Sequence, residues 1–148
     1  MKNFAENKKA YFDYEILDEY EAGIVLVGYE VKSIKTGKAS LKGSYVVIRN
    51  QEVYLVGANI SPYQPKNTPS DYNPDRDRKL LLNKDEIRHL IGKSKEKGFA
   101  LIPLKFYSKN GNIKLAFGIG KGKKKSDKRE TIKKRESDRE IKKEIEER

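Results

Sequence analysis

Two β-rich runs joined by an Asn-Gly pair constrain the fold of this chain more than any other feature of its sequence. The runs cover residues 99–107 and 113–119, and Asn110-Gly111 stands between them. Asparagine and glycine both tolerate the positive φ angles of the tightest turns between antiparallel strands. The sequence therefore predicts a long β-hairpin in the second half of the chain.

Further strands are expected before this hairpin. Aromatic and polar residues alternate over 11–16, and the branched run at 24–27 predicts a strand that is buried on both faces. Residues 45–48 and 53–60 are expected to form a second hairpin. Six antiparallel strands within residues 1–120 favour a closed, mainly β barrel, because closure leaves no exposed sheet edge.

One helix has clear boundaries in the sequence. Asn83 is a suitable N-cap, and Glu86 stands three residues later, where it completes a capping box. Leu82 is placed to pack on Ile87 as a hydrophobic staple, and Gly98 is expected to end the helix. We therefore predict an amphipathic helix that starts after Asn83.

A shorter helix and a long linker complete the predicted domain. Val31 and Ile34 share one helical face, and Gly37 can end this helix in the left-handed conformation. The segment 61–78 holds four of the five prolines. A segment of this length without an element of its own is uncommon unless it is functional or mobile.

Charge is distributed unevenly along the chain. The 33 Lys and Arg residues exceed the 22 Asp and Glu residues by 11. Residues 121–135 hold nine basic and two acidic residues, whereas residues 136–148 hold four and six. Because the last 28 residues contain only three isoleucines as apolar side chains, they are expected to be disordered alone. We predict a barrel domain at 1–120 and a basic tail at 121–148 that becomes helical on a partner, with a solvated appendage as the alternative reading of the tail.

Several classes of protein are excluded by composition. The chain has no cysteine, so disulfide scaffolds, thiolate zinc sites and thiol nucleophiles are absent. The lone His89 falls on the polar face of its predicted helix, which disfavours histidine catalysis. No run of about 18 apolar residues occurs, and no signal peptide is evident. The chain is expected to be cytoplasmic and not bound to a membrane.

Two candidate ligand motifs fail on their spacing. Residues 71–75 resemble the start of a calcium loop, but Arg76 stands where glycine is needed and Leu82 where glutamate is needed. The glycines at 118–122 lack the spacing of a phosphate-binding P-loop and are expected to let the last strand leave the barrel. No enzyme, metal site or cofactor is therefore expected.

Basic and aromatic residues favour RNA as the partner. Lys121, Lys123 and Lys124 would neutralise phosphates, whereas membrane binding would need a large apolar face that the tail lacks. Tyrosines such as Tyr11 and Tyr63 are able to stack on unpaired bases, although most aromatics of a small barrel belong to its core. Folded RNA is favoured over duplex DNA, because no helix suited to the major groove is evident. An oligonucleotide-binding (OB) barrel combines these features.

Seven short blocks occur in the order found in one known family. They are Asn7-Lys8-Lys9-Ala10, Tyr20-Glu21-Ala22-Gly23-Ile24, Gly28-Tyr29-Glu30-Val31-Lys32-Ser33-Ile34, Ala58-Asn59-Ile60-Ser61-Pro62-Tyr63, Arg76-Asp77-Arg78-Lys79-Leu80-Leu81-Leu82, Gly122-Lys123-Lys124 and Asp127-Lys128-Arg129. With these blocks the chain resembles the SmpB family, the SsrA-binding proteins, from about residue 7 to residue 140. Seven blocks in register over one domain make the resemblance specific.

The resemblance implies a function in bacterial trans-translation. Members of this family have an OB-like barrel of six antiparallel strands and three helices, with a basic C-terminal tail that is unstructured when free. The barrel binds the elbow of the tRNA-like domain of transfer-messenger RNA. With the elongation factor that delivers charged tRNA, the complex enters the A site of a stalled ribosome, where the tail folds as a helix in the empty decoding centre. The resemblance thus implies a monomeric adaptor whose partners are transfer-messenger RNA and the small-subunit RNA of the ribosome.

The resemblance also implies which residues contact RNA. Glu21, Leu81 and Asn83 match family positions at the RNA elbow. Lys121, Gly122, Lys123 and Lys124 match the path between barrel and tail, and Asp127, Lys128 and Arg129 match the triplet that approaches the decoding centre. At the first three positions a structural role is an alternative to RNA contact. Asn83 is suited to cap a helix, Leu81 lies in a leucine run, and Glu21 precedes an Ala-Gly pair typical of a turn.

Some residues depart from the family pattern. Tyr29, Asn59, Asp71 and Tyr72 occupy positions where the family usually has other residues, which leaves the contacts of the 61–78 linker open. From the basic tail alone, the second hypothesis is a ribosomal or general single-stranded RNA-binding protein. An RNA-cleaving enzyme is a distant third.

Overall fold

The computed structural model describes residues 2–124, 129 and 132. The strands are β1 Asn3–Glu6, β2 Tyr14–Ile24, β3 Ala39–Ser40, β4 Tyr45–Arg49, β5 Glu52–Val56, β6 Asn59–Ile60, β7 Arg78–Leu81, β8 Phe99–Lys109 and β9 Asn112–Gly122. The helices are α1 Lys8–Asp13, α2 Gly28–Lys35 and α3 Lys84–Ser94, with a 3-10 turn at Pro65–Asn67.

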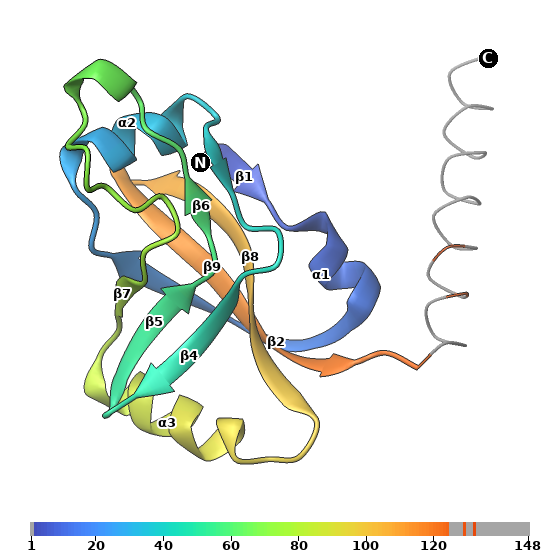
Figure 1. The fold of residues 1–148 in the computed structure, drawn as a ribbon. Helices are drawn as coiled ribbons and strands as arrows, with labels where there is room; N and C mark the ends of the chain where they lie inside the picture. The colour runs from blue at the N-terminus through green and yellow to red at the C-terminus, as the bar shows by residue number, and fades with distance from the viewer. Residues whose placement is uncertain (1, 125–128, 130–131, 133–148) are drawn as a thin grey trace.

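Six strands form a closed antiparallel ring. The order is β8-β4-β5-β7-β2-β9, and β9 pairs again with β8 to close the ring. β1 pairs with β8 outside this ring, while β3 and β6 form a separate two-stranded sheet. The predicted six-stranded barrel with three helices is therefore confirmed. Figure 1 shows α2 and α3 at opposite ends of the barrel, with α1 on its flank.

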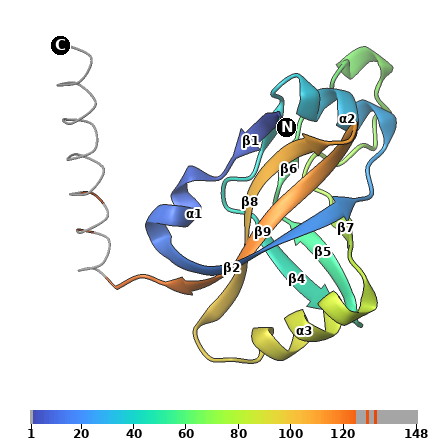
Figure 2. The ribbon, with the colours of Figure 1, turned by 180° about the vertical axis from the view of Figure 1, so that it is seen from behind.

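The two predicted hairpins hold the barrel together. β8 and β9 pair from Phe99↔Lys121 to Lys109↔Asn112, and Asn110 and Gly111 have φ angles of 52° and 79°. β4 and β5 pair in the same way across a turn in which Asn50 and Gln51 also have positive φ angles. Figure 2 shows the long β8–β9 hairpin from behind, where it lies alongside β2. The Asn-Gly signal thus marks the longest hairpin of the described fold.

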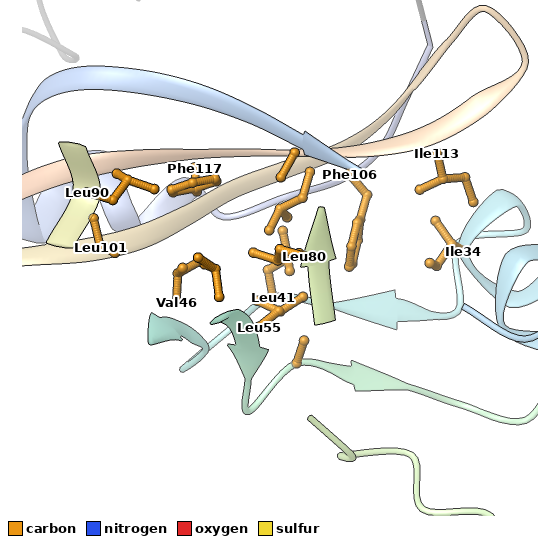
Figure 3. Close-up of a cluster of buried hydrophobic side chains, with 14 of the residues drawn as sticks. Ile34, Leu41, Val46, Leu55, Leu80, Leu90, Leu101, Phe106, Ile113 and Phe117 are labelled. Carbon is orange, nitrogen blue, oxygen red and sulfur yellow. The ribbon is translucent and has the colours of Figure 1, made fainter. Parts of the chain in front are cut away.

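The core fills the inside of the ring and is closed at each end by a helix. Phe106, Leu115 and Phe117 of the long hairpin are fully buried. In Figure 3, Leu90 of α3 lies near Phe117 at one end, and Ile34 of α2 lies near Ile113 at the other. A second, smaller cluster lies on the outer face of β8 and β9 beneath α1. Its buried members are Ala10, Ile102, Leu104, Tyr107 and Ala116.

Two glycines of β9 allow β2 to approach closely. A Cβ atom at position 118 would lie 2.8 Å from Cγ2 of Ile16 and 2.9 Å from the backbone oxygen of Asp18. At position 120 it would lie 3.1 Å from Cβ of Tyr14. The expectation that these glycines let the strand leave the barrel is therefore wrong for Gly118 and Gly120. They stand where β2 carries a bulge, so that a side chain would not fit at position 118 and would be tightly packed at position 120.

We expect Gly118→Ala to lower the free energy of unfolding by about 2 to 3 kcal/mol, because the added methyl group meets backbone that cannot move cheaply. Gly92→Ala is the matched control. Gly92 lies inside α3 with open space around its Cα, so alanine there should raise stability by up to about 1 kcal/mol. Urea unfolding of both variants measures the difference. If both substitutions change the free energy of unfolding by a similar amount, the close approach of β2 to Gly118 does not explain why glycine is needed there.

Several predicted boundaries are wrong. Residues 11–13 belong to α1 and not to a strand, because Asn7 anchors this helix on β8. The backbone N–H of Asn7 donates to Leu104 O at 2.7 Å, and its side-chain amide donates to Pro103 O at 2.9 Å. Residues 25–27 follow the end of β2 and lead to α2, so Val25 and Val27 are exposed and not buried on both faces. Helix α3 ends at Ser94, before Gly98.

Two strands differ from the predicted pattern within the linker and the second hairpin. Gly57, with a φ angle of 80°, separates β5 from β6, so the predicted strand at 53–60 is divided. Strand β7 begins at Arg78, the last residue of the predicted linker, and pairs with both β5 and β2. This short strand closes the barrel between them.

Candidate nucleic-acid interface

Three of the predicted RNA-binding residues lie along one side of the barrel. Gly23 of β2 pairs with Leu81 of β7, and Glu21 precedes Gly23 by two residues, so its side chain points to the same outer face. Asn83 follows Leu81 by two residues, at the start of α3. We call Glu21, Gly23, Leu81 and Asn83 the β2–β7 patch.

Leu81 is the apolar centre of this patch. Its side chain is 53% exposed, while the neighbouring Leu80 is buried in the core. The absence of a side chain at Gly23 lets Leu81 lie directly over β2, because a Cβ atom there would be 3.3 Å from Leu81 Cβ. An exposed leucine that packs over a glycine presents an apolar surface suited to a ribose or a base.

Glu21 is a carboxylate held by basic and phenolic neighbours. It accepts hydrogen bonds from the Tyr107 hydroxyl and from Lys109 Nζ, the latter at 3.2 and 3.3 Å. The Tyr107 hydrogen bond, with the charges of Lys109 and Lys114, lowers the pKa of Glu21. Burial and the hydrogen bond to Glu21 raise the pKa of Tyr107. Glu21 is therefore ionised and fixed in orientation, and it is suited to accept a hydrogen bond from a base or a 2′-hydroxyl.

Asn83 divides its side chain between two tasks. Its Oδ1 accepts from the backbone N–H of Glu86 at 2.8 Å, and Glu86 Oε1 accepts from the backbone N–H of Asn83 at 3.3 Å. The predicted capping box is confirmed. The side-chain NH₂ group of Asn83 makes no hydrogen bond within the part of the chain that the structure describes. It remains a donor at an exposed helix start, so capping and RNA contact are compatible.

A groove with a basic rim lies next to the patch, between β5, β7 and α3. Its volume is about 620 Å³. Leu81, Leu82, Ile87 and Ile91 provide its apolar lining. Lys79, Lys84 and Arg88 stand at its charged side, where Lys79 is paired with Glu52 at 3.1 Å and Arg88 with Asp85 at 2.8 Å. Of these three cations, Lys84 alone has no ion pair within the described residues.

The predicted path to the tail starts at the other end of the β2–β9 ladder. Lys121 and Gly122 are the last residues of β9, so the strand continues two residues past the predicted domain boundary. Lys123 donates its backbone N–H to Asp13 O and its Nζ to Tyr11 O, both at 2.9 Å. Lys124 follows with an exposed side chain. The chain is thus tied to α1 where it leaves the barrel.

The structure does not bring this path together with the β2–β7 patch. Glu21 lies opposite Ala116, whereas Lys121 lies opposite Glu15, five residues farther along β9, or about 17 Å. The two sets of predicted residues form two separate surfaces. Asp127 and Lys128 lie outside the described residues, and Arg129 is described as exposed.

A buried ionic cluster was not predicted from the sequence. The Glu30 carboxylate is completely buried and bonds to both Arg76 and Arg78. Arg78 donates Nη2 to Glu30 Oε2 at 2.7 Å and Nη1 to Ala58 O at 2.8 Å. The Tyr72 hydroxyl lies 3.1 Å from Glu30 Oε2, and burial together with the Glu30 charge raises the pKa of Tyr72 to about 12. The alternation of Arg78 with buried Leu80 along β7 was the signal that an arginine faces the core.

Other kinds of site find no support in the described residues. Among these, no cluster of three or more histidine or acidic side chains is arranged to hold a metal ion. None of the described helices is long and apolar enough to cross a membrane.

Comparison with known proteins decides the family. The model of the SmpB protein family matches residues 4–147. The chain is 49% identical to the SsrA-binding protein of Thermosynechococcus vestitus over 141 residues, which cover 95% of this chain and 93% of the relative. The chain belongs to the SmpB family. The SsrA-binding protein of Geobacillus sp. is 52% identical over 147 residues, covering 99% of this chain and 94% of that SmpB relative.

A solved structure supports the same assignment of this SmpB-family chain. One chain in the structure described as "tmRNA-SmpB: a journey to the center of the bacterial ribosome" is 44% identical, with a TM-score of 0.67. The match covers 86% of the present chain and 92% of that chain. The resemblance to SmpB proteins inferred from seven sequence blocks is therefore confirmed over nearly the whole length.

Proposed function

We propose that this chain is an adaptor that binds the tRNA-like domain of transfer-messenger RNA through the β2–β7 patch. The observation that carries the proposal is the identity of about half of all residues with SsrA-binding proteins over nearly the full length. The patch supplies chemistry that suits folded RNA, with an exposed leucine, an oriented carboxylate and a free amide donor on one side of a rigid barrel. The chain is an RNA-binding adaptor and not an enzyme.

The tail has a separate task in this proposal. The barrel of residues 1–120 holds the RNA, and the tail of residues 121–148 folds as a helix in the empty decoding centre of a stalled ribosome. Asp127, Lys128 and Arg129 approach the small-subunit RNA there. The protein acts as a cytoplasmic monomer, and the elongation factor that delivers charged tRNA brings the complex to the A site. The separation of the β2–β7 patch from the point where the tail leaves the barrel supports two distinct RNA surfaces.

We expect Leu81→Ala to weaken binding of the tRNA-like domain about 10-fold, because an apolar contact near the centre of the interface is lost. The salt dependence of binding should not change, since no phosphate contact is removed. Leu17→Ala is the matched control, because Leu17 lies on the same strand β2 and is 50% exposed. Filter binding over a salt series measures both variants against the wild type.

Two outcomes would contradict this proposal. If the wild type binds random RNA as tightly as the tRNA-like domain, the chain is a general RNA-binding protein. If Leu17→Ala weakens binding as much as Leu81→Ala, the β2–β7 patch is not the interface.

A further inference from the structure

Two lysines lie against a tyrosine at the C-terminal end of α2, and two more stand on the adjoining elements. The ring centre of Tyr63 lies 5.9 Å from Lys32 Nζ and 5.5 Å from Lys38 Nζ, and Lys38 Nζ also donates to Tyr63 O at 3.2 Å. Lys35 stands in the last turn of α2, and Lys66 lies in the nearby 3-10 turn. We call these five residues the α2 patch.

The positive charge of the α2 patch is not neutralised by its surroundings. None of its four lysines forms an ion pair with a carboxylate within residues 2–124, whereas Lys79 and Lys109 do so elsewhere on the barrel. The dipole of α2 favours basic residues in its last turn. This effect accounts for Lys32 and Lys35 but not for Lys38 and Lys66, which lie beyond the helix. The patch therefore has the character of an anion-binding surface.

The loop that carries Tyr63 is fixed at both ends. At its start, Ser33 Oγ donates to Ser61 O at 2.7 Å, and the Ser61 N–H donates to Lys38 O at 3.0 Å. Near its end, the Tyr72 hydroxyl donates to Ile60 O at 2.7 Å, and Arg78 Nη2 donates to Pro74 O at 2.9 Å. Lys32 and Lys38 thus meet at Tyr63 on a preorganised surface, which lowers the entropic cost of binding.

The α2 patch lies on different elements from the other two predicted RNA surfaces. Figure 1 shows α2 and the green 3-10 turn at the end of the barrel opposite α3, whose N-cap is Asn83 of the β2–β7 patch. The chain leaves β9 on a third side, next to α1. An RNA seated on the β2–β7 patch therefore leaves the α2 patch exposed to a different partner.

We propose that the α2 patch binds the phosphate backbone of ribosomal RNA. Lysine ammonium groups supply the charge for phosphates, and the tyrosine between them offers an aromatic edge to a neighbouring ribose or base. This inference rests on the proposed function, because that function brings the barrel into the ribosome with one side already occupied by transfer-messenger RNA. The patch then holds the barrel on the ribosome independently of the tail.

The test replaces Lys32, Lys35 and Lys38 by glutamine in the full-length chain. The control replaces Lys93, Lys95 and Lys97 by glutamine, which lowers the net charge from +11 to +8 in the same way. We expect the first variant to bind purified ribosomes about 10- to 100-fold more weakly, with a salt slope smaller by about 2. Its affinity for the isolated tRNA-like domain should stay within about 2-fold of the wild type, while the control changes neither.

Distinct outcomes separate this inference from the proposed function. Equal ribosome affinity in the two triple variants overturns the α2 patch, and so does a loss of affinity for full-length transfer-messenger RNA without ribosomes. Failure of the wild type to prefer the tRNA-like domain overturns the proposed function instead. If the triple variant does not fold, the double variant Lys35→Gln, Lys66→Gln gives a second test, because both side chains are exposed and neither forms a hydrogen bond or ion pair within the described residues. An unchanged ribosome affinity there also counts against the patch.

Discussion

A chain that ends at Lys124 is expected to bind the tRNA-like domain nearly as well as the full-length chain and to lose tagging of stalled products completely. All strands of the barrel and the whole β2–β7 patch lie before this point. Lys123 still ties the end of the chain to α1 through Asp13 and Tyr11. The structure places the cut here and not at residue 120, because β9 continues to Gly122. An in vitro tagging assay on ribosomes stalled without a codon measures the loss.

Loss of charge does not explain the expected result. Residues 125–148 hold ten basic and eight acidic residues, so their removal lowers the net charge only from +11 to +9. Replacing Asp127, Lys128 and Arg129 by alanine in the full-length chain tests the same step more finely. Tagging by the shortened chain would refute a separate function of the tail. Loss of binding to the tRNA-like domain would show that the barrel and tail share one interface.

The parts of the fold with strong local signals were predictable from the sequence. Asn110-Gly111 adopts the positive φ angles that its residue types favour, and Asn83 with Glu86 forms the capping box that its spacing indicates. Residues 11–13 and 25–27 were wrongly predicted as strand, because their local patterns suit a strand while contacts with β8 and the turn toward α2 determine their conformation. Strand β7 could not be found from a four-residue pattern, since its partners β5 and β2 are distant in the sequence.

The candidate site was predictable only in part. Asn83 had a local signal as a helix cap, but RNA contact at Glu21, Leu81 and Asn83 was predicted from the resemblance to a family, because none of these residue types alone points to RNA. The structure adds Gly23, whose missing side chain makes room for Leu81. Two departures from the family pattern also gain a physical reason, since the rings of Tyr29 and Tyr72 pack edge to face at 5.1 Å. The two unusual residues therefore fit each other.

Replacing Arg78 by methionine is expected to lower the free energy of unfolding by about 3 to 5 kcal/mol, because it leaves the buried Glu30 without its main partner. Both side chains are completely buried, and Arg78 also satisfies the carbonyl oxygens of Ala58 and Pro74. Arg49→Met is the matched control. Its ion pair with Asp77 is exposed, so its loss should cost at most about 1 kcal/mol. Urea unfolding at neutral pH measures both variants, and similar costs would contradict the role given to the buried pair.

The pH dependence of stability provides an independent check on this pair. Burial alone raises the pKa of Glu30, but hydrogen bonds from Arg76, the Val27 backbone and Arg78 outweigh it, so the pKa lies below its ordinary value of 4.5. A carboxylate with a lowered pKa stabilises the fold above its unfolded pKa, and this stabilisation is lost as the pH falls through the folded value. In the Arg78→Met variant, protonation of Glu30 removes a buried negative charge that has lost one of its two arginine partners, so acidification costs the variant less stability. The difference in the free energy of unfolding between wild type and variant should therefore become smaller as the pH falls below about 4.5. A difference that stays constant would mean that Arg78 acts by packing and not by charge.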